Sequence, residues 1–69
     1  MKIRYDVNRM TGMNSVRFES LKDAFALAKA MAREYDEEIV LAKLVWDDTN
    51  HIVGSGTVLV SASGKFRYI

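Results

Sequence analysis

The first residues of the chain alternate between polar and apolar side chains. Over Lys2–Asn8 the apolar positions are every second one, namely Ile3, Tyr5 and Val7. A period of two with one apolar side is typical of a strand that buries one face. A turn-rich stretch around Gly12 follows, and the pattern then predicts a second short strand over Val16–Glu19, with Val16 and Phe18 on the apolar side.

The period changes to that of a helix at Leu21. Ser20 stands where an N-cap is expected, and Asp23 follows it at the spacing of a capping box. At about 100° per residue one apolar stripe collects Leu21, Ala24, Phe25, Ala28, Met31, Ala32 and Tyr35. Consecutive acidic residues interrupt this stripe, so we expect the helix to end near Tyr35 or Asp36.

The C-terminal half reads as strands joined by tight turns. Ile39–Trp46 is apolar on both sides, which is typical of a central strand. We assign Val40, Ala42, Leu44 and Trp46 to its core side, with Trp46 between sheet and helix near Phe25 or Ala28. The further segments are a turn at 47–50, a short strand at 51–53 that adds an edge or is absent, a break at 54–56, and strands at 57–61 and 65–69 around a turn at 62–64.

These segments predict an α+β fold in which one helix packs on one face of a single antiparallel sheet of four to five strands, in the order β-β-α-β-β-β. The 69 residues suffice for one domain, 1–69, and 49% hydrophobic with 28% charged residues is a globular composition. The predicted core is the helix stripe with Ile3, Tyr5, Val7, Val16, Phe18, Val40, Ala42, Leu44, Trp46, Val58, Val60, Phe66 and Tyr68.

The composition limits the chemistry and the cellular compartment that we expect for the protein. The chain has no cysteine, so it has neither disulfide nor thiolate chemistry. Its apolar runs, such as Ile39–Ala42, are far too short to span a membrane. The opening residues Met1–Tyr5 contain no apolar stretch of signal-peptide length, and we expect a cytoplasmic protein.

Charge is segregated in the predicted fold. The sheet face opposite the helix collects six basic residues against Asp6 and Glu19 in a protein of net charge +1. We take these basic residues as candidate partner-binding residues: Lys2, Arg4, Arg17, Lys43, Lys65 and Arg67. The face is either a solvated surface whose Lys and Arg stems shield Leu41, Val45 and Leu59, or a docking surface for an acidic partner. Base stacking is disfavoured, because alternation assigns the aromatic residues to the helix side; a one-residue shift of register would reverse that.

The loop Arg9–Met13, with Met10 and Met13, forms a second candidate. Exposed methionines suit adaptable protein contacts, and the alternative is that one of them packs under the sheet edge.

Catalytic and metal-binding patterns are absent from the sequence. His51 is the only histidine, and the acidic residues before it belong to a predicted turn, not to a spaced ligand set. Ser61–Lys65 is not a phosphate loop, because Leu59 stands at the first glycine position and Phe66 at the Ser or Thr position. We therefore expect no enzyme activity, no metal and no cofactor.

The layout resembles the small phage-encoded anti-CRISPR proteins of the type I inhibitor kind. The resemblance is carried by the opening strand Lys2–Val7, the strand Val16–Ser20 that leads into the alanine-rich helix, and the closing hairpin Thr57–Ile69 with Gly64 and Lys65 at its turn. It implies a non-catalytic inhibitor that docks on a CRISPR effector complex and blocks DNA binding or nuclease recruitment. The alternatives are a small regulator that binds nucleic acid through the basic face, and a self-associating module. We expect a larger protein or ribonucleoprotein as partner, no membrane, and a monomer or homodimer.

Overall fold

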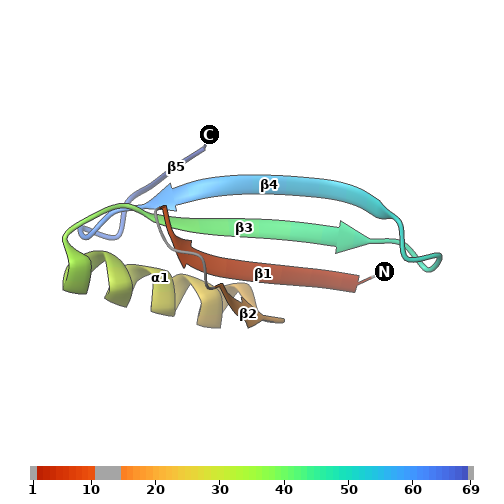
Figure 1. Ribbon diagram of the computed structural model, residues 1–69, viewed down its shortest axis with the longest axis horizontal. Coiled ribbons are helices and arrows are strands. Elements are labelled where there is room, and N and C mark those ends of the chain that lie inside the picture. Colours follow the sequence, from red (N-terminus) through yellow and green to blue (C-terminus); the bar gives the residue numbers. More distant parts are fainter. Residues whose placement is uncertain (1, 11–14, 69) are drawn as a thin grey trace.

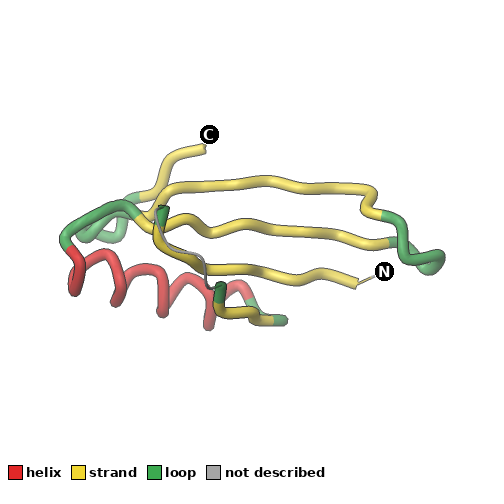
Figure 2. The backbone as a smooth tube through the Cα atoms, in the orientation of Figure 1, coloured by secondary structure: helices red, strands yellow, loops and turns green. Residues whose placement is uncertain are grey.

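A computed structural model describes residues 2–10 and 15–68 of the chain. It confirms the α+β fold: one helix packs on an antiparallel five-stranded sheet of order β2-β1-β3-β4-β5 (Figures 1 and 2). The elements are β1 (Lys2–Arg9), β2 (Val16–Phe18), α1 (Leu21–Tyr35), β3 (Ile39–Trp46), β4 (Ile52–Val60) and β5 (Phe66–Tyr68).

The helix begins and ends where the sequence predicts. The Ser20 side chain accepts a hydrogen bond from the backbone N–H of Asp23, which satisfies one free donor of the first turn. At the other end Asp36 adopts a left-handed conformation with φ 51°, and its N–H donates to the Ala32 carbonyl. These caps confine α1 to the stretch with helical periodicity.

Alanines set the distance between the helix and the sheet. Ala24, Ala28 and Ala32 are fully buried and pack against Val7, Ile39, Leu41 and Val60. Because an alanine side chain is a single methyl group, the helix lies close to the strands, and the larger Phe25 and Met31 flank the contact as half-buried residues.

The predicted orientation of β3 is wrong. In the register, Val7 lies opposite Leu41, and Leu41 lies opposite Val58, so these side chains share the helix side. Val40, Ala42, Leu44 and Trp46 therefore lie on the sheet face away from α1, which we call the open face, whereas Leu41, Lys43 and Val45 lie on the helix side. Because β3 is apolar on both sides, its own alternation does not determine which side faces the helix; pairing with β1 and β4 does.

β4 also differs from the prediction. It is one strand over Ile52–Val60 that continues through Gly54 and Gly56, with a register shift opposite Val45 and Trp46. The sequence predicts a break at 54–56 by a bulge or a loop; residues 54–56 stay in the ladder, and the irregularity is a register shift between Ile52 and Gly54.

Strands β1, β3 and β4 run past the N-terminal end of α1, and the β3–β4 hairpin projects beyond it (Figure 1). This gives the molecule extents of 39 × 21 × 20 Å. We call the projecting part, residues 2–4, 44–46 and 52–55 with the turn between, the arm. Several predicted core residues are exposed. Ile3, in the arm, is 37% exposed, and on the edge strands β2 and β5 Val16 is 47%, Phe66 55% and Tyr68 79% exposed. In the described residues no helix is long and apolar enough to cross a bilayer.

Candidate functional site

Three of the predicted binding residues gather on the open face, two on the arm and one beside it. Lys2 and Arg4 project from β1, and Arg17 projects from the neighbouring β2, in which it lies opposite Asp6. Trp46 joins them because β3 pairs Lys2 with Trp46 and Arg4 with Leu44. We call Lys2, Arg4, Asp6, Arg17 and Trp46 the arginine–tryptophan patch.

Arg4 is the central residue of this patch. Its guanidinium carbon lies 4.7 Å from the centroid of the Trp46 ring, a cation–π contact. On its other side, Arg4 Nε lies 3.3 Å from Asp6 Oδ1. Both atoms are buried and neither makes a hydrogen bond of good geometry within the described part of the chain, so the contact is an ion pair without a directional bond. The ring and the carboxylate together restrict Arg4, whose side chain is only 24% exposed.

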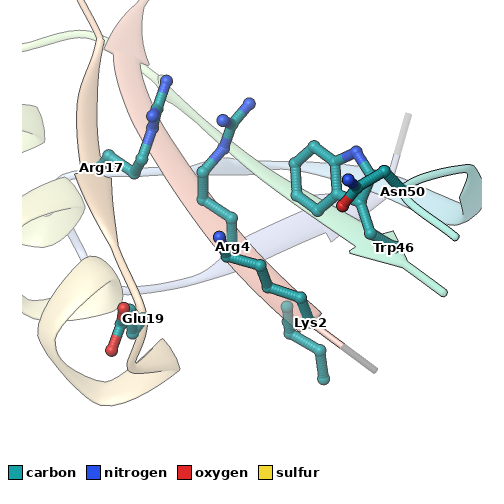
Figure 3. A pocket seen from close by; sticks show the side chains of 7 residues that line it. Lys2, Arg4, Arg17, Glu19, Trp46 and Asn50 are labelled. Atoms are coloured by element: carbon teal, nitrogen blue, oxygen red, sulfur yellow. The ribbon is translucent and has the colours of Figure 1, made fainter. Parts of the chain in front are cut away.

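Arg17 is a second, more exposed ion-pair partner of the Asp6 carboxylate. Its Nε lies 3.8 Å from Asp6 Oδ1, and its side chain is 67% exposed. Figure 3 shows the side chains of Arg4 and Arg17 extending in the same direction, with the Trp46 ring on the far side of Arg4. Two cations thus share one carboxylate, and with Lys2 further along β1 the patch has a formal charge of +2.

The patch borders a pocket of about 430 Å³, lined by Lys2, Ile3, Arg4, Arg17, Glu19, Trp46 and Asn50. The pocket exists because β2 pairs only with Tyr5–Val7, which leaves the edge of β1 open at its first residues. Glu19 lies at the opposite end from the guanidinium tips (Figure 3). The pocket therefore combines cationic tips, an indole and the apolar side of Ile3.

Arg67 lies on the open face as predicted, but it is already paired. Its Nε and Nη2 each donate a 2.9 Å hydrogen bond to the carboxylate of Glu38. The hydrogen bond from Arg67 holds the pKa of the Glu38 carboxyl below its ordinary value and raises the pKa of Arg67. Leu59, which lies opposite Arg67 and Val40, is only 3% exposed although no helix covers this face. At this end of the open face Leu59 is therefore buried, and the charge of Arg67 is neutralised by Glu38.

Lys43 does not join the patch. It lies opposite Tyr5 and Gly56 on the helix side, past the covered part of the sheet, so its predicted place on the open face is wrong. A β-carbon built at Gly56 would meet nothing within 4 Å, which shows how open this region is. Lys43 is therefore exposed to solvent on the helix side of the sheet and not on the open face.

The remaining predicted residues lie elsewhere. Lys65 is exposed in the turn before β5, where its carbonyl accepts a hydrogen bond from Ser61 N–H. Met10 is 62% exposed at the end of β1, and Met13 falls outside the described residues. Neither described residue contacts the patch in any interaction that the structure records.

The tip of the β3–β4 hairpin is the turn that the sequence predicts. Asp47 Oδ1 accepts hydrogen bonds from the Thr49 N–H at 2.8 Å, the Thr49 hydroxyl at 2.7 Å and the His51 N–H at 3.0 Å. The bond from the Thr49 side chain, followed by that from the His51 backbone, lowers the pKa of Asp47. Within residues 2–10 and 15–68 no group of His, Asp and Glu side chains is suited to hold a metal ion.

Trp46 is the site residue that sequence reasoning missed. Lys43, the one charged residue of Ile39–Trp46, favours placing the odd-numbered positions outside. The signal that would have placed Trp46 correctly is the strand pairing itself: the register that joins Val7 to Leu41 joins Lys2 to Trp46.

Comparisons with protein-family models, with curated proteins and with solved structures find no match for this chain.

Proposed function

We propose that the protein is a non-catalytic binding protein that docks through the arginine–tryptophan patch on an anionic surface of a larger ribonucleoprotein. The observation that carries this proposal is the restraint of Arg4 between Trp46 and Asp6, beside the exposed Arg17. A cation that is already held in place loses little conformational freedom on binding, and Arg and Trp are the residue types that contribute most at interfaces.

The partner that we propose is a CRISPR effector complex, in keeping with the resemblance to small phage-encoded inhibitors. The surplus charge of the patch suits the acidic or nucleic-acid surface of such a complex. Bound there, the protein blocks DNA binding or nuclease recruitment by occupying space, and it needs no reactive group. A small nucleic-acid-binding regulator would use the same patch, and the response to salt separates the two: binding to phosphates alone falls steeply with salt, and mixed apolar and polar docking falls less.

The test is inhibition of a purified type I effector complex by the purified protein. We expect inhibition at near-equimolar ratio and no chemical change in the complex. Arg17→Glu should abolish inhibition, whereas Lys43→Glu, which changes the net charge equally on the other sheet face, should preserve it. Failure of the wild-type protein to inhibit, or equal effects of the two variants in folded proteins, overturns the proposal.

A further inference from the structure

The pocket beside the patch brings together two kinds of binding group that a single nucleotide matches. On one side are the guanidinium tips of Arg4 and Arg17, which extend the same way from two adjacent strands (Figure 3). On the other side is the indole of Trp46, whose ring centroid lies 4.7 Å from the guanidinium carbon of Arg4. A phosphate and a planar base occur together in every nucleotide, whereas a peptide needs separate acidic and aromatic side chains to supply both.

The Nε atoms of the two arginines face Asp6, so their terminal nitrogens remain for a ligand. Asp6 Oδ1 lies 3.3 Å from Arg4 Nε and 3.8 Å from Arg17 Nε. Guanidinium groups hydrogen-bond phosphate oxygens through paired donors. Glu19 also lines the pocket, so the charged lining residues together with Asp6 keep a formal charge of +1. An anion at the tips is therefore attracted without displacing Asp6.

The form of the pocket favours a single strand over a duplex. It opens at the edge of β1 where β2 ends, and its walls reach from Arg17 on β2 across to Asn50 at the hairpin tip. The indole–guanidinium pair offers a planar surface only to an unstacked base, because paired bases in a duplex are covered on both faces. Asn50, with a left-handed φ of 64°, adds an amide to the lining of the pocket, and an amide can donate to and accept from a base edge.

We propose that this pocket binds one nucleotide of a single-stranded nucleic acid, with the phosphate on Arg4 and Arg17 and the base against the planar pair of Arg4 and Trp46. The inference rests on the proposed docking through the patch, and it identifies an exposed nucleic-acid strand as the part of the ribonucleoprotein that the patch contacts. Lys2 adds a third positive charge beside these two arginines for a neighbouring phosphate.

The test uses the fluorescence of Trp46, which is the only tryptophan of the chain. The full-length protein is titrated with a short oligothymidylate, an abasic strand of the same length, a duplex of the same length and an oligoglutamate peptide. We expect the oligothymidylate to quench Trp46 and to bind about tenfold more tightly than the abasic strand, which is within the range of stacking one base. Arg17→Glu should weaken binding, and Lys43→Glu should leave it unchanged.

Three results would overturn the inference. If the abasic strand binds as tightly as the oligothymidylate, the protein recognises phosphate alone. If the duplex binds more tightly than the oligothymidylate, the protein does not contact an unpaired base. If oligoglutamate binds as tightly as the oligothymidylate, the site is one for carboxylates. If no oligonucleotide binds while Arg17→Glu still abolishes inhibition of the effector complex, the nucleotide inference is wrong and the docking proposal stands. A labelled oligothymidylate followed by anisotropy extends the test to Trp46→Leu, which should bind more weakly while retaining the circular dichroism of the folded protein.

Discussion

The guanidinium carbon of Arg4 lies 4.7 Å from the centre of the Trp46 ring, on the sheet face that α1 leaves uncovered. The two residues come from β1 and β3, and they meet because the strand register places Arg4 next to the pair formed by Lys2 and Trp46. Trp46, the largest side chain of the protein, thus contacts a cation on the open face. The buried hydrophobic residues are alanine, valine, isoleucine and leucine.

This placement predicts a moderate cost for removing the indole. Trp46→Ala loses a cation–π contact and part of a half-buried surface, so we expect a loss of about 1–2 kcal/mol in the free energy of unfolding. Ile39→Ala removes a fully buried side chain and should cost about 2–5 kcal/mol. Urea denaturation of both variants measures the difference. A larger loss for Trp46→Ala than for Ile39→Ala would contradict the structure.

The close approach of α1 to the sheet predicts that enlarging its buried alanines is costly. Ala28 has no exposed surface, so Ala28→Leu must move the helix or the strands and should destabilise the fold by about 1–3 kcal/mol. Ala30 lies on the exposed side of the same helix, and Ala30→Leu is the matched control. Thermal unfolding should show a lower Tm for the first variant alone. Equal Tm values would mean that the helix does not pack through its alanines.

Two glycines should respond to substitution with opposite signs. Gly56 lies in an edge region of β4 with open space around its missing β-carbon, so Gly56→Val should stabilise the strand by up to about 1 kcal/mol. Gly64 has a φ of 85°, and a β-carbon there would lie 3.1 Å from Lys29 Cε. Gly64→Val should therefore destabilise the β4–β5 turn. The denaturation midpoints of the two variants test this, and a shift of both in the same direction would be inconsistent with the backbone described.

The ion pairs at the start of β3 predict a loss of stability in acid. Hydrogen bonds from Arg9 and Arg67 hold the pKa values of Glu37 and Glu38, respectively, below their ordinary value of 4.5. The folded protein then binds these protons less tightly than the unfolded chain. The stabilisation is complete above pH 4.5 and disappears as the pH falls through the lower pKa of the folded state.

Arg67→Gln isolates one of these pairs. The substitution should return the pKa of Glu38 towards 4.5 and leave the pKa of Glu37 lowered, because Arg9 still donates to Glu37. A titration of the side-chain carboxyl carbons by NMR reads both groups in one experiment. An unchanged pKa for Glu38 in the folded variant would show that Arg67 is not its partner.

Much of the fold could be predicted from the sequence, and the part that could not has one physical origin. Lys2–Asn8 alternates strictly, so Val7 is correctly assigned to the helix side, and Ser20 is correctly assigned as the helix cap. Those features are local, because the pattern of the segment itself determines them. β3 carries apolar residues on both sides, and its orientation depends on which neighbours it pairs with, which no local pattern contains.

For the same reason, only some of the predicted site residues were placed on the correct sheet face. Lys2, Arg4 and Arg17 were placed together correctly, because they lie on strands whose alternation is clear. Lys43 and Trp46 exchanged faces, since both belong to β3. The bidentate pairing of Arg67 with Glu38 depends on a contact between segments far apart in the chain, so the sequence alone gave no reason to remove Arg67 from the free cations.

The patch, the pocket and the proposed docking all depend on the orientation of Trp46. Nuclear Overhauser contacts of the single indole in the free protein test it most directly. The structure predicts contacts from the ring protons of Trp46 to the side chain of Arg4. It predicts none to the methyl group of Ala28, which α1 buries against the other face of the sheet. Contacts from the indole to Ala28 or Phe25, with none to Arg4, would place Trp46 in the core and contradict the account.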